Sequence, residues 1–96
     1  MPAYVIAEME IHDPEQYKRY TDAVPDVIAA HGGRFVARGG DLAVLEGDWQ
    51  PKRLVVLEFD DLATAKGWYE SAEYQEIKAL RDGAATLNIV AVEGVG

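Results

Sequence analysis

Hydrophobic and polar positions alternate along the chain with two different periods, and these periods divide it into strands and helices. Residues 3–11 alternate with a period of two, as in a β-strand with two unlike faces. One face carries Val5, Ala7, Met9 and Ile11, and the other carries Tyr4, Ile6, Glu8 and Glu10. The pattern therefore predicts a strand at residues 3–11.

A helix is predicted directly after this strand. Asp13 is suited to the N-cap, Pro14 to the first helical position, and Gln16 completes a capping-box pattern. Pro25 should kink the helix or split it near Ala23, because proline lacks the backbone donor of a helix interior. The helix should end at the pair Gly32-Gly33. Its buried stripe is predicted to be Tyr17, Tyr20, Val24, Val27, Ile28 and His31.

Residues 34–46 have strand character on both sides of Gly39-Gly40-Asp41. Two structures fit this pattern: a tight hairpin at the glycines, or one long strand bent by a glycine bulge. If the strand continues through the glycines without an inserted residue, Val36, Leu42 and Val44 all fall on the same face of it. This slightly favours the bent strand. Arg38 is expected on the same face.

The second half of the chain repeats the alternation of strand and helix. Residues 47–51 are typical of a turn, residues 53–59 form the most strand-like run, and residues 86–93 should be the last strand. Asp60 or Asp61 should cap a helix, Ser71 should begin a shorter one, and Gly83 should end it. The side chains expected to face inward from these helices are Leu62, Ala65, Trp68, Tyr69, Tyr74, Ile77 and Leu80.

The order β-α-β-β-α-β predicts an α+β sandwich of the ferredoxin-like kind, with an antiparallel sheet and both helices on one face. Several strands are nevertheless apolar on both faces: Leu54 and Val56 oppose Val55 and Leu57. Four strands of ~20 Å at ~4.8 Å spacing leave an uncovered face of roughly 400 Å². We therefore expect a homodimer formed through the sheet face.

Four runs of sequence resemble those of a known family: "HGGRFVARGG", "LEGDW", "RLVVLEF" and "AKGWYESAEYQEIKALR". The chain resembles the domain-of-unknown-function family DUF1330 from Tyr4 to Gly94. The resemblance implies a ferredoxin-like fold of the dimeric α/β-barrel superfamily and a face-to-face dimer. It implies no activity, because the family has no established one. More distant members of that superfamily include cofactor-independent monooxygenases, isomerases and haem enzymes, so the fold alone does not decide function.

Composition narrows the class of protein further. The 96 residues suit one domain (1–96), and 49 % hydrophobic residues describe an ordinary globular chain. A net charge of −8 argues against nucleic-acid binding, which relies on Lys and Arg. No apolar run approaches ~20 residues, and no signal-peptide layout occurs at the N-terminus. We expect no membrane association and a cytoplasmic location.

Three groups of residues could carry chemistry. The two glycine pairs are interpreted as a helix cap and a chain bend, since no phosphate-binding loop motif matches. Arg38, Arg53, Glu8 and Glu58 are charges on otherwise apolar strands. They could pair across the sheet or the dimer interface, or they could line an apolar pocket in which a desolvated carboxylate acts as acid or base.

The third group joins aromatic side chains to a guanidinium. Trp68, Tyr69, Tyr74 and Arg81 are typical of core packing, but they could also surround a planar acidic or phenolic ligand. Together with Arg38 they are the predicted ligand-binding residues. Glu58, Tyr69 and Arg38 are the candidates for catalysis.

Metal and cofactor chemistry is not expected. The chain has no cysteine, and its two histidines, His12 and His31, show no HExxH or HxH spacing. Ser71, the only serine, lacks the GxSxG context of a hydrolase nucleophile.

Three functions remain open from the sequence. The first is a homodimer that binds a small molecule between sheet and helices or at the dimer seam. The second is a cofactor-independent monooxygenase or isomerase acting on a small aromatic or acidic metabolite. The third is a structural interaction module without a ligand.

Overall fold

The computed structural model describes residues 1–95 and confirms the predicted order of strands and helices. A short 3₁₀ turn at Ala79–Arg81 follows the last helix and is the one addition to the predicted order. The elements are β1 (Ala3–Ile11), α1 (Pro14–Ala30), β2 (Arg34–Arg38), β3 (Leu54–Phe59), α2 (Leu62–Glu70), α3 (Ala72–Lys78) and β4 (Ala85–Glu93).

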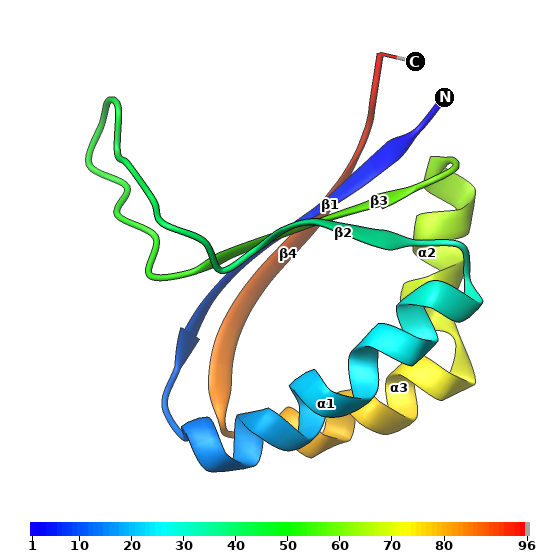
Figure 1. Cartoon of the computed structure of the whole chain (residues 1–96), viewed down its shortest axis with the longest axis horizontal. Coiled ribbons are helices and arrows are strands. Elements are labelled where there is room, and N and C mark those ends of the chain that lie inside the picture. The colour runs from blue at the N-terminus through cyan, green and yellow to red at the C-terminus, as the bar shows by residue number, and fades with distance from the viewer. Residues whose placement is uncertain (96) are drawn as a thin grey trace.

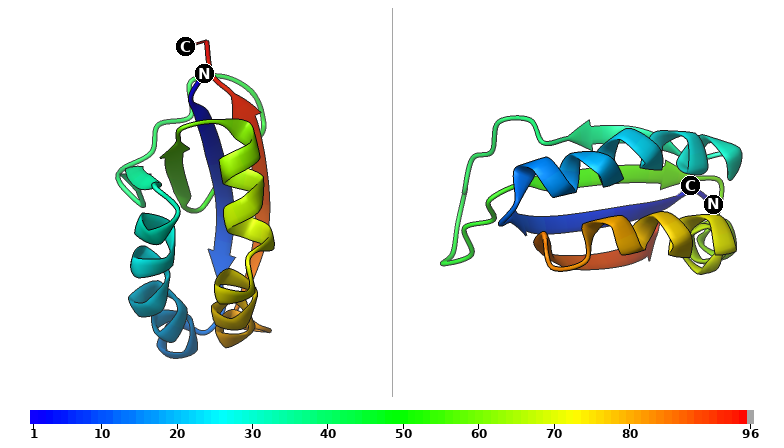
Figure 2. Two further views of the ribbon diagram at one scale, coloured as in Figure 1. Left: turned by 90° about the vertical axis from the view of Figure 1, so that its right-hand side faces the viewer. Right: turned by 90° about the horizontal axis from the view of Figure 1, so that it is seen from below.

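The four strands form one antiparallel sheet in the order β2-β3-β1-β4. All helices lie on one face of this sheet, and the other face is uncovered (Figure 1). Figure 2 shows α1 along the half of the sheet that contains β2 and β3, and α3 along the half that contains β4. This is the predicted ferredoxin-like α+β fold. Within residues 1–95, no helix has both the length and the apolarity that crossing a bilayer requires.

The core lies between the sheet and the helices. Inward-facing residues of β1 and β3 meet the buried stripe of α1 and an aromatic group from α2 and α3. Phe59, Trp68 and Tyr74 stack in sequence, with ring centroids 5.3 and 4.5 Å apart. Such contacts add to the stabilisation that burial of the rings already provides.

The predicted N-caps and the glycine end of α1 are confirmed, whereas α3 ends at Lys78, before Gly83. Asp13, Asp61 and Ser71 each accept a hydrogen bond from the backbone N–H three residues further on. At the end of α1, the N–H of Gly33 donates to Ile28 and the N–H of Gly32 donates to Ala29. Gly32 has a positive φ of 75°, so this is a Schellman cap of the kind that favours glycine.

Of the two predicted effects of Pro25, a kink or a split near Ala23, the split does not occur, because α1 is continuous from Pro14 to Ala30. Proline cannot donate to the carbonyl four residues earlier, which belongs to Thr21. That carbonyl instead accepts a hydrogen bond from the Arg38 guanidinium, with Nη2 3.2 Å from the oxygen. A side chain from β2 thus replaces the missing helix bond.

Both predicted structures for residues 34–46 are also wrong. Strand β2 ends at Arg38, and the chain leaves the sheet at Gly39 (φ 69°) to form a loop of residues 39–53 without helix or strand. Residues 41–50 are all exposed, and the loop projects beyond the sheet (Figure 1). Paired arms in this place would have no core to cover them, and an isolated two-stranded hairpin is only marginally stable.

A bulge does occur, but it lies earlier in β2 than predicted. The register with β3 shifts between Phe35 and Ala37. Because of this extra residue, the side chains after the bulge point to the opposite faces from those expected. Arg38 therefore lies on the helix side of the sheet with Phe35, and not on the face of Val36. The expectation that Arg38 and Val36 share a face is therefore corrected.

Candidate functional site

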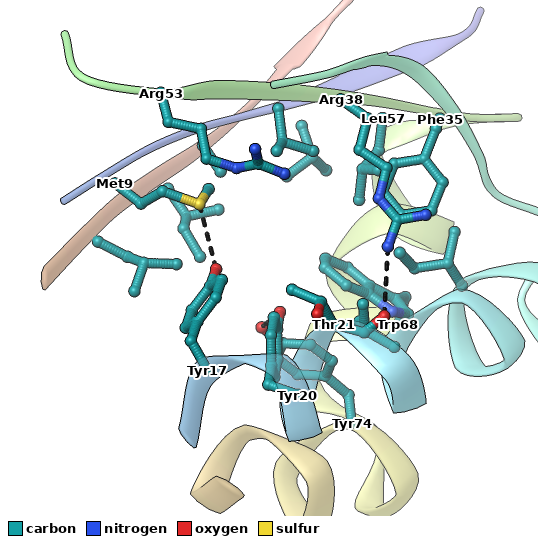
Figure 3. A pocket seen from close by; sticks show the side chains of 17 residues that line it. Met9, Tyr17, Tyr20, Thr21, Phe35, Arg38, Arg53, Leu57, Trp68 and Tyr74 are labelled. Atoms are coloured by element: carbon teal, nitrogen blue, oxygen red, sulfur yellow. Dashed lines mark hydrogen bonds between the residues drawn. The ribbon is translucent and has the colours of Figure 1, made fainter. Parts of the chain in front are cut away.

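A pocket lies between the sheet and α1, near the edge formed by β2 (Figure 3). Its volume is about 50 Å³, which is room for roughly three to five water molecules. Apolar side chains of β1, β3 and α1 form most of the wall, and Trp68 and Tyr74 close the end toward α2 and α3. The pocket is therefore small, apolar and built from the core.

Arg38 crosses from the sheet to the helix beside this pocket. Its guanidinium carbon is 4.3 Å from the centre of the Phe35 ring, and Nη2 bonds the Thr21 carbonyl. The side chain remains solvent-exposed overall. Arg38 thus forms part of the wall and faces water at the same time.

Arg53 also enters the pocket, although the sequence indicated it only as one charge among several. Figure 3 shows its guanidinium pointing from the end of the loop toward the space between the layers. Its Nε atom is buried and has no hydrogen-bond partner among residues 1–95. A Cβ on Gly39 would overlap the Arg53 guanidinium, so the glycine leaves the space that Arg53 occupies.

The aromatic end of the pocket holds a hydrogen-bonded series. The hydroxyls of Tyr20 and Tyr74 are 2.8 Å apart, and Nη2 of Arg81 donates to the Tyr74 oxygen at 3.3 Å. Trp68, only 3 % exposed, has no partner for its indole N–H within residues 1–95. The Nε atom of Arg81 is likewise buried and has no partner among residues 1–95, so this end contains two buried donors without an acceptor.

The five predicted ligand-binding residues are divided between two cavities. Arg38, Trp68 and Tyr74 line the inner pocket. Trp68, Tyr69 and Arg81 line an open cleft of about 450 Å³ beside β4. Trp68 lines both cavities, as do Val5, Leu87 and Ile89.

Glu58, a candidate for catalysis, lies on the opposite face of the sheet from the pocket. It forms an ion pair with Arg34 and accepts a hydrogen bond from the Tyr4 hydroxyl at 3.2 Å. Glu8 lies on that face too, bound to Asn88 and to the indole N–H of Trp49. The structure does not bring either carboxylate together with Arg38.

Both histidines have ordinary side-chain partners. His12 lies 2.9 Å from the Thr86 hydroxyl, and His31, the C-cap of α1, lies 3.2 Å from a Glu73 carboxylate oxygen. Among residues 1–95, no group of three or more His, Cys, Asp or Glu side chains could hold a metal ion.

Burial changes the acidity of two phenols in the pocket wall. It raises the pKa of Tyr17, an effect that the positive charges of Arg81 and Arg53 partly oppose. Burial beside Tyr74 raises the pKa of Tyr20 further. The Tyr17 hydroxyl donates only to the Met9 thioether sulfur, a weak acceptor, at 3.1 Å.

These shifts predict a loss of stability in alkali. The folded state holds the protons of Tyr17 and Tyr20 more tightly than the unfolded state, in which tyrosine has its ordinary pKa of about 10. Stability is therefore full below about pH 10 and falls progressively as the pH rises above that value. We expect the phenolate absorbance of these two tyrosines to develop together with loss of the far-ultraviolet helix signal. A titration of all five tyrosines well before unfolding would contradict this.

Fold and site together define the class: a ferredoxin-like α+β domain with one uncovered sheet face and a small pocket between its layers. The chain belongs to the family described as Domain of unknown function (DUF1330), whose model matches residues 2–95. This confirms the resemblance seen in the sequence. A search among curated proteins gives no match.

Solved structures share the fold at low sequence identity. A protein of unknown function from Rhodopseudomonas palustris is 17 % identical, with a TM-score of 0.77 over 99 % of this chain and 83 % of that one. A dimeric ferredoxin-like protein of unknown function from Thermobifida fusca is 19 % identical, with a TM-score of 0.64 over 98 % and 92 %. SnoaB, a cofactor-independent oxygenase from Streptomyces nogalater, is 10 % identical, with a TM-score of 0.66 over 99 % and 94 %.

Proposed function

We propose that this protein is a homodimer that binds a small molecule in the pocket between its sheet and its helices. The observation that carries the proposal is a pair of buried N–H donors, Arg53 Nε and Trp68 Nε1, without a partner among residues 1–95. A buried donor left unsatisfied costs about 1–3 kcal/mol, so native proteins rarely keep two in one pocket. A bound ligand with acceptor atoms would remove this cost.

The predicted ligand-binding residues have distinct parts in this proposal. Arg38, Trp68 and Tyr74 would contact the ligand, because they line the inner pocket. Tyr69 and Arg81 would act from the outer cleft, where Arg81 holds the Tyr74 hydroxyl.

Two features support the dimer. The open sheet face is apolar at its centre, where the register places Val56, Ile6 and Val90 in one row. The loop of residues 39–53 adds exposed apolar side chains next to that face, among them Leu45 at 94 % and Trp49 at 60 % exposure. Structures of the same fold include dimers. A second copy of the chain would cover both features at once.

An enzyme of the oxygenase or isomerase class is the second candidate, since SnoaB, with the same fold, is an oxygenase. The three candidates for catalysis differ in whether they line a cavity where a substrate could bind. Arg38 and Tyr69 line cavities, whereas Glu58 is bound to Arg34 on the other face. Binding is therefore the function that the geometry supports better.

Native mass spectrometry of the purified protein tests the proposal. We expect a dimer with a reproducible added mass, or a dimer whose melting temperature rises with a small-molecule ligand. Val55 lies in the pocket wall, so Val55→Phe should fill the space and abolish the added mass or the rise, while Val55→Ile retains it.

Two results would contradict this proposal. A dimer without added mass that no compound stabilises would identify a structural module. Turnover of a bound compound would identify the enzyme instead.

A further inference from the structure

The pocket has a charge opposite to that of the protein around it. The chain has 17 acidic and 9 basic residues, but the pocket wall contains Arg38 and Arg53 and, among residues 1–95, no Asp or Glu. Neither arginine has an ion-pair partner within the described chain. The only charges in this apolar space are therefore positive and uncompensated.

An unpaired guanidinium in an apolar pocket is costly, because it loses water without gaining a counter-charge. Arg38 reduces that cost by its exposure and by the Thr21 carbonyl. The Nε atom of Arg53 has neither solvent exposure nor a hydrogen-bond partner among residues 1–95. An anion is the ligand that would satisfy it.

The surroundings of Arg53 indicate where such an anion would lie. Figure 3 shows its guanidinium above the Met9–Tyr17 pair. The Tyr17 hydroxyl donates only to the Met9 sulfur, so it is free to turn to a better acceptor. Arg53 and Tyr17 would thus offer a guanidinium and a hydroxyl to the same oxygen atoms, as carboxylate sites do.

The rest of the pocket limits the body of the ligand. Its walls are apolar, and about 50 Å³ leaves room for only a few non-hydrogen atoms unless Arg38 moves outward. The Trp68 N–H lies at the far end without an acceptor among residues 1–95. A phosphate group carries a charge of about −1.5 to −2 and three acceptor oxygens. The second cation of the wall, Arg38, already bonds the Thr21 carbonyl and lies over the Phe35 ring, so Arg53 suits a single negative charge better.

We infer that the pocket binds a small monocarboxylate with a compact apolar body, and that Arg53 is the residue that holds the carboxylate. This inference rests on the proposed function and specifies its ligand class. Arg53 is then the specificity residue, and Arg38 closes the mouth over the bound molecule.

Matched ligand pairs test the charge. The melting temperature of the full chain is measured with propionate and propionamide, and with butyrate and butyramide, at constant ionic strength. We expect stabilisation by at least one carboxylate and none by its amide. Inorganic phosphate at the same concentration should leave the melting temperature unchanged.

Matched variants test the residue. Arg53→Met should weaken carboxylate binding by about tenfold or more, since the hydrogen bonds lost involve two charged groups. Arg53→Lys should restore part of it. Arg19→Met, on the exposed surface of α1, removes the same charge elsewhere and should change nothing.

The stability of the ligand-free protein separates binding from a structural role. If Arg53 serves a ligand, Arg53→Met removes an uncompensated charge and leaves the ligand-free melting temperature unchanged or higher. A marked fall with unchanged carboxylate binding would overturn the inference. Equal stabilisation by amides and carboxylates would overturn it but keep the proposed function. No stabilisation by either pair overturns it as well, and the added mass in native spectra then decides the proposed function separately.

Discussion

Trp68→Ala is expected to lower the free energy of unfolding by about 3–5 kcal/mol. The Trp68 ring is 3 % exposed and packs against Phe59, Tyr74 and Tyr69, with centroids 5.3, 4.5 and 6.1 Å away. It also lines both the inner pocket and the outer cleft, so its truncation enlarges the space on both sides. A chain of this size has a total stability of only about 5–15 kcal/mol. The variant should therefore be partly unfolded at room temperature or under mild denaturant.

Urea unfolding followed by circular dichroism measures this loss at one protein concentration. Trp68→Phe is the matched control, because it keeps an aromatic ring against Tyr74 and removes the unpartnered N–H. We expect it to lose much less stability than Trp68→Ala. A loss below about 1 kcal/mol for Trp68→Ala would mean that the ring does not support the core.

Val90→Glu is expected to convert the proposed dimer into a folded monomer. Val90 is 59 % exposed in the single chain and lies in the apolar row with Ile6 and Val56 on the open sheet face. In a symmetric face-to-face dimer the substitution places an uncompensated carboxylate from each copy in the interface. A buried unpaired charge costs several kcal/mol, so the dissociation constant should rise by about a hundredfold or more.

Sedimentation over a range of concentrations gives the dissociation constant, and circular dichroism checks the fold. Val95→Glu is the control, because Val95 is 101 % exposed and its replacement introduces the same charge outside the sheet. It should remain dimeric. A Val90→Glu protein that stays dimeric would show that another surface joins the two copies.

The regular part of the fold is predictable from the sequence because periodicity and caps agree at each element. Asp13 and Ser71 are recognisable as N-caps by residue type alone, and residue type narrows the third cap to Asp60 or Asp61. Asp13, Ser71 and Asp61 each have the expected hydrogen bond. The effect of Pro25 is not predictable, because the sequence does not reveal a replacement donor. Arg38, 13 positions further along the chain, supplies it only once the sheet and helix are packed.

The site is less predictable, because a single inserted residue changes which side chains face inward. The bulge between Phe35 and Ala37 turns Arg38 toward the helices, and no residue type in β2 indicates it. The direction of Arg53 depends on the path of the loop back from Gly39, which the sequence does not specify. The face of Glu58 is predictable, because it alternates with Leu57 and Phe59, which face the helices. Glu58 therefore lies on the open face, where it pairs with Arg34 across the sheet.

The loop of residues 39–53 begins and ends at the pocket, with Gly39 against the Arg53 guanidinium. Its exposed middle, with Leu45 and Trp49, belongs to the surface assigned to a second copy. Ligand binding would then act on the ends of this loop, and assembly would act on its middle. Thermodynamic linkage requires such an effect to be mutual: the factor by which dimerisation tightens ligand binding equals the factor by which ligand tightens the dimer. A higher protein concentration, which favours the dimer, and a higher ligand concentration, which favours the bound state, would thus stabilise the same conformation of this loop.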